Sequence, residues 1–333
     1  MDKILPSKRL EWLDAIKGIG ILLIMACHTG LLPRISFLFT AGYISIFFVA
    51  SGYTYKAKDS FREEISKRCK RLLVPYFFWV SLSLVLLYVL NIKQNFLAGI
   101  YGMLYSRYSL YFGMETKNDV LLLPFTGNTP PWFLTGLFIA LMLMYFVRRA
   151  HTVLIIIFCI VLSMIAIYIP VLLPWSIDTA LIGTLQIYAG AQIRGGQLKT
   201  INKWPSFLLV GCFYVALLAF DRTNNISVRI YGNHEPISVI SYTLTGIMEF
   251  CLMSYVFRLF ESKKIVRWLA EIGRLSLVLM CIHDPINTIF KSTFYDGKLI
   301  MIISYLSIIS LASLIRIFGK KINYPLVSCL LGI

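Results

Sequence analysis

Charged side chains are scarce in this 333-residue chain. Asp, Glu, Lys and Arg make up 14% of it and hydrophobic residues 58%, whereas a soluble domain carries roughly 25% charged residues. The shortage extends over the whole length, and even the stretch 92–131, which lacks a strong apolar run, contains Leu and aromatic clusters. This composition leaves no room for a large soluble domain and favours a polytopic integral membrane protein.

The chain also lacks the marks of a cleavable signal peptide and of a metal centre. Its first apolar run contains His28 and ends at Pro33 without a small-residue cleavage site, so we interpret it as a first span. The seven Cys are scattered, with no C-x-x-C pair and no clustering with the four His. We therefore expect no metal site and no bound cofactor. No aromatic–basic module for nucleic acid is present.

Long apolar runs are abundant, and ten of them are candidate membrane spans. A helix needs about 20 mostly apolar residues, with a range of roughly 17–25, to cross the hydrocarbon core. The candidates lie at about 15–33, 38–55, 72–91, 132–147, 152–169, 174–192, 205–220, 237–257, 275–290 and 299–317. No internal repeat or low-complexity linker separates them. The sequence therefore predicts an all-α bundle of about ten transmembrane helices forming one domain over residues 1–333.

Positive charge is distributed unevenly between the two sides of this bundle. If the N-terminus is cytoplasmic, most of the 32 Lys and Arg residues fall in the inner segments, with the largest clusters at 56–71 and 258–274. Such an asymmetry follows the positive-inside rule. The sequence predicts that both termini are cytoplasmic, that the protein lies in the inner (plasma) membrane, and that its positive charge contacts anionic lipids.

Three ionisable residues lie in or beside the first span, where charge is costly and therefore indicates function. Asp14 and Lys17 are three residues apart and can pair on one helix face. Lys17 and His28 are eleven residues apart, which is about three turns, so both face the same way with about 16 Å between them along the axis. We expect Lys17 near the cytoplasmic interface and His28 deep in the span.

Two further ionisable residues fall inside later spans. His283 lies in the outer half of the ninth candidate span, as His28 does in the first, so the two side chains could meet. A hydrogen bond between helices is the alternative role for His283. Glu249 lies in the middle of the eighth candidate span and must be protonated, paired or facing water, which makes it a candidate for a substrate cavity.

The basic segment before the third span, which includes Arg68 and Arg71, permits two interpretations. It is either an ordinary cytoplasmic loop that follows the positive-inside rule, or a clamp for phosphate groups, which Arg binds in a bidentate manner. Its sequence alone does not separate the two.

Five elements of the sequence, taken in order, resemble the membrane-bound acyltransferase family 3. They are Arg9-Leu-Glu-Trp-Leu-Asp14-Ala-Ile-Lys17-Gly followed by His28, Phe47-Phe-Val-Ala-Ser51-Gly52, Lys67-Arg68-Cys-Lys70-Arg71-Leu-Leu-Val-Pro75-Tyr76, Pro131-Trp132-Phe133-Leu134, and Ile272-Gly273-Arg274-Leu-Ser276 followed by His283. The chain looks most similar to the fucose 4-O-acetylase-like branch. It departs from many members in having Lys17 where they have Arg, and we expect no extracytoplasmic SGNH domain.

The resemblance implies an O-acyltransferase that moves an acetyl or similar acyl group from acyl-CoA, its co-substrate, to a hydroxyl of a surface glycan or its lipid-linked precursor. A histidine suits the role of general base. We expect His28 to activate the sugar hydroxyl for direct attack, with an acyl-His28 intermediate as the alternative route. Lys17 and Asp14 would orient the helix or bind the donor.

We expect Arg68 and Arg71 to hold the donor phosphates, and His283, Glu249 and Ser51 to lie around the substrate. Ser51-Gly52 also fits a point of close helix packing, since Ser51 has no neighbouring base in the sequence. A proton-coupled transporter or glycan exporter is the alternative function, because buried His and Glu also suit proton coupling. The absence of inverted hydropathy symmetry argues against it.

Overall fold

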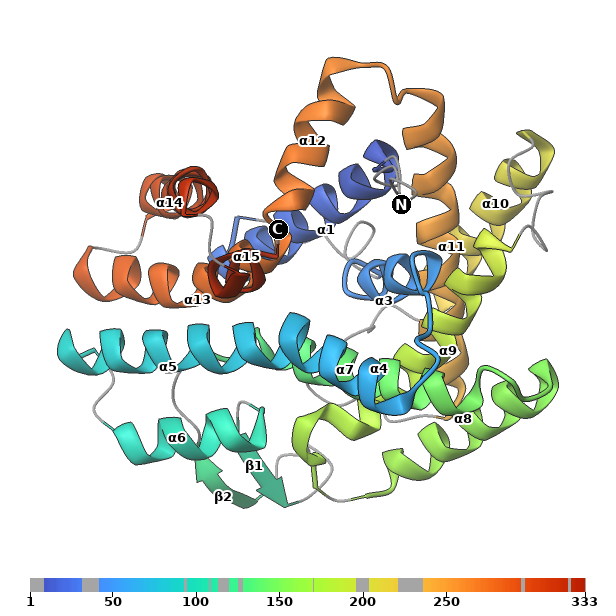
Figure 1. Ribbon diagram of the computed structural model, residues 1–333, viewed down its shortest axis with the longest axis horizontal. Coiled ribbons are helices and arrows are strands. Elements are labelled where there is room, and N and C mark those ends of the chain that lie inside the picture. The colour runs from blue at the N-terminus through green and yellow to red at the C-terminus, as the bar shows by residue number, and fades with distance from the viewer. Residues whose placement is uncertain are drawn as a thin grey trace, which may run out of the picture.

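The structure is a computed structural model, which describes residues 9–31, 42–92, 95–107, 109–112, 120–124, 128–169, 171–195, 204–220, 236–294, 297–322 and 325–332. Its helices in the first half of the chain are α1 (Glu11–Thr29), α3 (Ser45–Tyr53), α4 (Phe61–Arg68), the π-helix η2 (Cys69–Leu73), α5 (Val74–Val89), α6 (Phe96–Tyr105), α7 (Trp132–Val147) and α8 (Thr152–Ile167). A 3₁₀ turn, η3 (Pro174–Ser176), leads into the second half, with α9 (Ile177–Arg194), α10 (Trp204–Phe220), α11 (Pro236–Leu259), α12 (Lys264–Arg274), α13 (Ser276–Thr293), α14 (Lys298–Lys321) and α15 (Pro325–Leu331). Figure 1 shows their arrangement.

Each of the ten apolar segments coincides with a helix where it is described, but ten membrane crossings are not confirmed. Four helices are long and apolar enough to cross a membrane: Glu11–Thr29, Phe61–Val89, Val239–Leu259 and Lys298–Lys321. Four more apolar helices are shorter, among them Trp132–Val147 with 16 residues. At 1.5 Å per residue such a helix spans about 24 Å, less than the roughly 30 Å of a hydrocarbon core. The chain is an integral membrane protein with spans of unequal length.

The stretch 92–131 holds structure that the apolar pattern did not predict. It contains α6 and an antiparallel hairpin of β1 (Ser109–Phe112) and β2 (Val120–Pro124), with an irregularity in register between Leu110 and Tyr111. The amphipathic α12 and the short α15 were likewise not predicted. The helical bundle matches the predicted all-α class, and the hairpin is an addition at one end of it.

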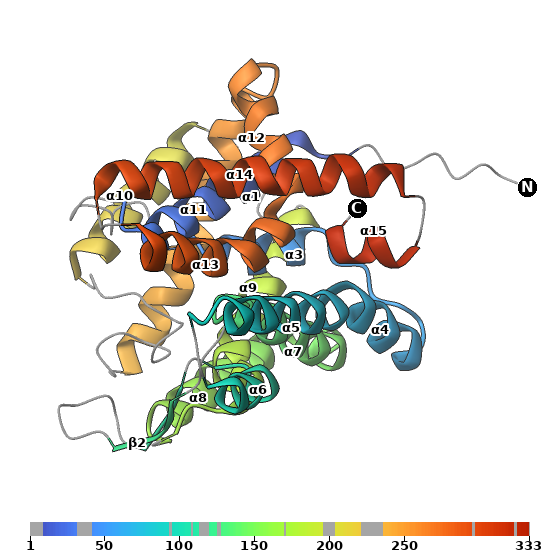
Figure 2. The ribbon, with the colours of Figure 1, turned by 90° about the vertical axis from the view of Figure 1, so that its left-hand side faces the viewer.

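The helices cross one another at several angles. Figure 1 shows α14 nearly end-on while α5 and α13 lie in the plane of the picture, and in Figure 2 α4 and α15 lie at one end of the molecule and β2 at the other. Contacts tie other helix ends to the α4 end. Tyr145 near the end of α7 donates to the carbonyl of Asp59 (3.2 Å), and Arg194 at the end of α9 donates to the carbonyl of Tyr55 (3.4 Å). The helix ends that carry most of the positive charge therefore meet on one face.

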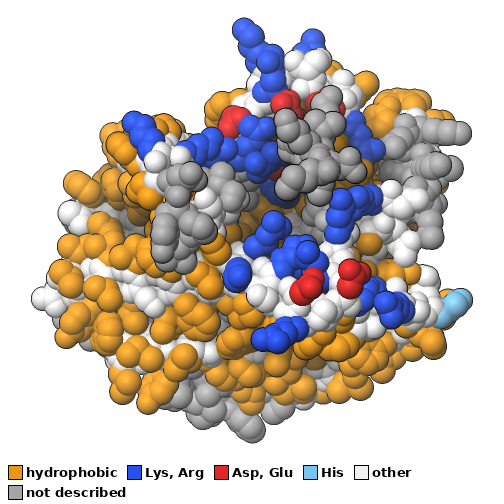
Figure 3. All heavy atoms as spheres, in the orientation of Figure 1, with side chains coloured by type: hydrophobic (Ala, Val, Ile, Leu, Met, Phe, Trp, Pro, Cys, Tyr) orange, Lys and Arg blue, Asp and Glu red, His pale blue; other side chains and the backbone are white. Residues whose placement is uncertain are grey.

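Figure 3 looks onto this face. Lys and Arg side chains gather over its hollow centre, and hydrophobic side chains surround them at the perimeter. An apolar perimeter with a basic end face is the expected surface of a bundle embedded in lipid.

Glycines allow the helices of the site to approach closely. A Cβ on Gly18 of α1 would clash with the backbone of Leu269 in α12, and one on Gly273 would clash with the backbone of Asp14. A Cβ on Gly52 of α3 would likewise meet the backbone of Ile187 in α9. Small residues at such crossings are typical of membrane helix packing. The interpretation of Ser51-Gly52 as a close-packing point is therefore confirmed.

Candidate functional site

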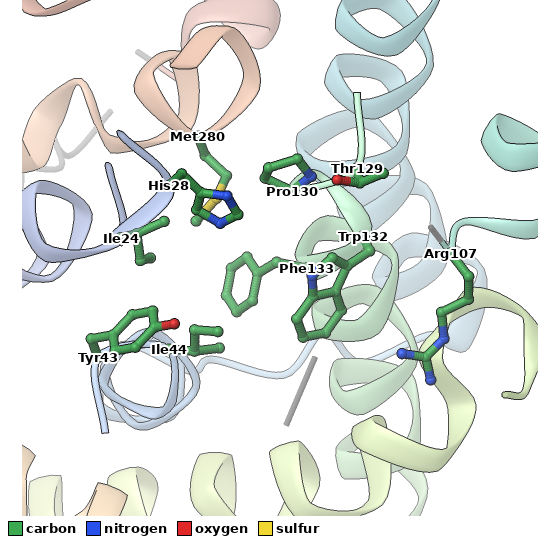
Figure 4. A pocket seen from close by; sticks show the side chains of 10 residues that line it. All are labelled: Ile24, His28, Tyr43, Ile44, Arg107, Thr129, Pro130, Trp132, Phe133 and Met280. Carbon is green, nitrogen blue, oxygen red and sulfur yellow. The ribbon is translucent and has the colours of Figure 1, made fainter. Parts of the chain in front are cut away.

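The first part of the site is a cavity at the end of α1, which we call the histidine cavity. It is lined by Ile24, His28, Tyr43, Ile44, Arg107, Thr129, Pro130, Trp132, Phe133 and Met280. Its volume is about 130 Å³, against about 30 Å³ for one water molecule. Figure 4 shows His28 and Tyr43 on one side of it, Arg107 on the other, and Trp132 and Phe133 from the start of α7 between them. The cavity is thus bordered by the imidazole of His28, by aromatic side chains and by the guanidinium of Arg107.

The side chain of His283 in α13 contacts that of His28. The two imidazole ring centroids are 5.0 Å apart, with the rings at 65° in an edge-to-face arrangement. The Nδ1 of His283 lies 2.9 Å from the carbonyl oxygen of Leu279, one turn back in α13. Asn287, one turn further along, donates to the carbonyl of His28 (3.0 Å). The structure therefore confirms the predicted meeting of the two histidines and ties α13 to the end of α1.

The orientation of His283 differs from what the sequence suggested. Its side chain is fully buried and does not line the histidine cavity. With Nδ1 donating to Leu279, Nε2 is an acceptor, and no described residue hydrogen-bonds to it. His283 is therefore placed to act on His28 and not directly on a ligand in the cavity.

The second part of the site is a basic cavity formed by two adjoining hollows of about 610 and 620 Å³, which share Arg9, Asp14, Lys17 and Arg71. Its further basic lining residues are Lys56, Lys70, Arg194 and Arg274. Asp14 is the acidic residue among the described lining. The hollow in Figure 3 lies on the same basic face. A cavity with this charge favours a polyanionic ligand.

Asp14 organises the floor of the basic cavity. Its carboxylate lies 3.5 Å from Lys17 Nζ, 2.8 Å from Arg9 Nε and 3.5 Å from Arg274 Nε. The predicted pairing of Asp14 with Lys17 is thus present, and two arginines join it. Because one carboxylate faces three cations, the cluster keeps a net positive charge.

A π-helix brings Arg71 to the basic cavity. Pro75 has no N–H, so it cannot bond to a carbonyl in the preceding turn. The helix widens there to the five-residue π register, in which Val74 bonds to the carbonyl of Cys69. The carbonyl of Lys70, which faces the missing N–H of Pro75 in that register, accepts instead from the thiol of Cys329 in α15. This break turns Lys70 and Arg71 toward the cavity and closes one wall of it with α15.

Arg68 lies elsewhere, although the sequence grouped it with Arg71. Its Nη2 pairs with Glu64 (2.6 Å), whose side chain is fully buried, and its guanidinium lies over the ring of Tyr55 at 5.2 Å. It lines neither hollow of the basic cavity. The local reason is helical spacing: Glu64 and Arg68 are one α-helical turn apart, whereas the π-helix interrupts that spacing before Arg71.

Glu249 and Ser51 also lie away from both cavities. Glu249 is buried in α11, where Tyr214 of α10 donates to its Oε2 (3.3 Å) and Gly42 packs against it. Ser51 is half-buried in α3, and its carbonyl accepts from Thr54 (3.3 Å). The structure therefore brings together His28 and His283, and separately Asp14, Lys17 and Arg71.

The sequence missed a buried ion pair at the histidine cavity. Arg107 pairs with Asp178 at the start of α9, and their side chains are 1% and 3% exposed. Three residues beside this pair have left-handed backbones without being glycine: Ser106 (φ 59°), Trp175 (φ 54°) and Ser176 (φ 57°). Such strain costs about 1–3 kcal/mol per residue and concentrates at functional sites. The available signal in the sequence was the carboxylate of Asp178, which lies within the candidate span 174–192.

His28 lies in the last turn of α1 with its side chain exposed, and not deep in the span as the sequence suggested, whereas His283 beside it is buried. This histidine pair and the basic cavity lie at opposite ends of one helix. Residues 10–318 match the family described as an acyltransferase domain. Because the match covers nearly the whole chain, the chain belongs to the membrane-bound acyltransferase family 3 and is an acyltransferase. No curated protein and no solved structure matches it.

Proposed function

We propose that this acyltransferase moves an acetyl or similar acyl group from acyl-CoA to a hydroxyl of a sugar in a surface polysaccharide or its lipid-linked precursor. The fucose 4-O-acetylase-like branch is the subtype that we propose within the family. We place the protein in the inner (plasma) membrane with both termini in the cytoplasm, so that the basic face meets the cytoplasm.

The observation that carries the proposal is that one helix serves both cavities. Lys17 of α1 lines the basic cavity and His28 of the same helix lines the histidine cavity. Eleven residues separate them, or about 16 Å along the axis. A donor with a polyanionic head and a long, narrow arm fits this spacing, with its phosphates at Lys17 and its thioester near His28.

The basic cavity suits the phosphates of CoA. Arg9, Lys17 and Arg71 border both of its hollows, and Arg274 lies beside Asp14 on the same floor. Charge-assisted hydrogen bonds from such groups to phosphate oxygens are about twice as strong as neutral ones. In this proposal Asp14 holds the cations in position and does not contact the donor.

His28 is the proposed general base. Its imidazole accepts the proton of the acceptor hydroxyl as the oxygen attacks the thioester carbonyl. The tetrahedral intermediate collapses to the ester, the C–S bond breaks, and the thiolate of CoA takes the proton from the imidazolium. The acyl-His28 route differs only in that the imidazole attacks first and the hydroxyl second. His283 supports His28 through the edge-to-face contact of the two rings.

The test is thioester consumption by the purified protein in detergent, with labelled acetyl-CoA and a sugar-acceptor panel. We expect His28→Ala to lower transfer by about 10²–10⁴-fold, the usual contribution of a general base. His151→Ala is the matched control, because His151 is exposed before α8 and lines neither cavity. Full activity in His28→Ala would refute the assigned base, and an inert wild-type protein would count against acyl-CoA as donor.

The transporter alternative loses its support once the family is known. Family membership shows an acyltransferase, and the described buried groups are accounted for by the two cavities and by helix contacts. A transporter would also leave the thioester intact in the same assay.

A further inference from the structure

The buried Arg107–Asp178 pair holds one wall of the histidine cavity in a fixed geometry. Arg107 Nε donates to the carbonyl of Leu173 (3.1 Å), and its Nη2 donates to Asp178. The amide of Thr179 donates to the same carboxylate (2.8 Å). The guanidinium also lies 6.0 Å from the ring centre of Trp132. No described residue accepts a hydrogen bond from Arg107 Nη1, so this nitrogen keeps its donors for a ligand.

A second small hollow continues the histidine cavity past Arg107. Arg107 and Thr129 line both, and Asn128 lines the second. Asn128 donates from Nδ2 to Ser83 Oγ (3.2 Å) and to the carbonyl of Cys281, while no described residue donates to its buried Oδ1. This wall thus contains the fixed guanidinium donors of Arg107, the unpaired Oδ1 acceptor of Asn128 and the indole of Trp132.

We propose that Arg107, held by Asp178, is a specificity-determining residue of the acceptor site, which takes an uncharged sugar and rejects an anionic one. This inference rests on the proposed function, since it assigns the histidine cavity to the acceptor. Hydroxyl groups accept from Arg107 and donate to Asn128, and an apolar sugar face packs on Trp132.

The charge balance of the cavity supplies the selectivity. Arg107 carries the formal charge among the described lining residues, and Asp178 cancels it at contact distance. An anionic sugar would leave water for a site in which the positive charge of Arg107 is already neutralised, so its desolvation would not be compensated. The basic cavity at the other end of α1 has the opposite character, with many cations around Asp14. The polyanionic donor therefore binds in the basic cavity, and the uncharged acceptor binds in the histidine cavity.

The experiment compares matched methyl hexopyranosides and methyl hexuronides, which differ in a hydroxymethyl or carboxylate group, as acceptors for the wild-type protein with acetyl-CoA. For every pair in which at least one member is acylated, we expect kcat/KM to be at least about 10-fold higher for the neutral member. This is the scale of one charge-assisted contact. Equal use, or preference for the hexuronide, would overturn the inference while leaving the proposed function intact. Failure to consume acetyl-CoA with any acceptor would count against the proposed function itself.

Two variants separate recognition from folding. In Asp178→Asn the charge of Arg107 is no longer cancelled, so the relative kcat/KM for the hexuronide should rise about 10-fold or more. The double variant Arg107→Gln/Asp178→Asn keeps an uncharged, hydrogen-bonding pair. It should raise the acceptor KM about 10-fold without changing the donor KM, and unchanged acceptor KM would show the pair to be structural only. If Asp178→Asn does not accumulate, the double variant and the wild-type preference decide the question.

Discussion

At the scale of single residues, His283 acts through another side chain. It is fully buried, it touches His28 edge to face at 5.0 Å, and its Nδ1 lies within hydrogen-bond distance of the Leu279 carbonyl. Groups that orient a functional side chain without contacting the ligand typically contribute 10–100-fold where this has been measured at metal sites.

We therefore expect His283→Ala to lower kcat by about 10–100-fold, less than His28→Ala, with the donor KM unchanged. His283→Gln, which retains polar atoms in the same space, should recover part of the loss. Steady-state kinetics in both substrates provide the measurement. A His283→Ala protein as inactive as His28→Ala, with the glutamine variant no better, would place His283 among the reacting groups instead.

Arg71 and Arg68 should behave differently although three residues separate them. Arg71→Ala removes a cation from the basic cavity, so the KM for acetyl-CoA should rise about 10-fold or more. Arg68→Ala leaves the buried Glu64 unpaired, and breaking such a pair costs about 3–5 kcal/mol. We expect lower thermal stability in detergent with the donor KM retained. Arg149→Ala, at an exposed position after α7, is the control for both; a raised donor KM in Arg68→Ala alone would contradict the assignment.

At the scale of elements, the crossing of α1 and α12 fixes the basic cavity. The backbones of Gly18 and Gly273 meet those of Leu269 and Asp14, and Arg274 follows directly. Any side chain at the crossing pushes Asp14 and Arg274 apart.

Gly273→Ala should therefore destabilise the protein by about 1–3 kcal/mol or more, the usual cost of overpacking, and should weaken donor binding at the same time. Gly211→Ala in α10 is the matched control, because its Cβ would meet only a Leu252 side-chain atom at 3.9 Å. Thermal unfolding in detergent and the acetyl-CoA KM together give the result. A Gly273→Ala protein with wild-type stability would show that the two helices can separate without loss.

At the scale of the whole molecule, the positions of the helix ends make the orientation testable. Lys298 begins α14 and Lys320 lies in its last turn, so the two lie on opposite sides if α14 crosses the membrane. In a background without native cysteines, Lys298→Cys should react with a membrane-impermeant thiol reagent in intact spheroplasts. Lys320→Cys should react only after permeabilisation. The reverse pattern would invert the proposed topology and place the basic cavity outside.

Much of this architecture could be predicted because lipid is a simple solvent. A helix in hydrocarbon must be apolar along its length, so the apolar runs located the helices, and their flanking charges indicated which ends share a face. The spacing of Asp14, Lys17 and His28 followed from helix geometry alone, and the structure shows the expected ion pair. The ten-span count was less secure, since a run of 16 residues such as α7 satisfies a composition pattern without the length of a full span.

Only the tertiary structure decided which polar groups share a site. Arg107 and Asp178 are 71 residues apart, and no periodicity links them. Arg68 and Arg71 look equivalent in the sequence. Because Pro75 induces a π-helix between them, Arg68 pairs with Glu64 while Arg71 lines the basic cavity. Periodicity and hydropathy describe how one helix meets lipid, whereas the site depends on how several helices meet one another. That depends on the Gly18, Gly52 and Gly273 crossings and on strained turns, which local sequence rules do not determine.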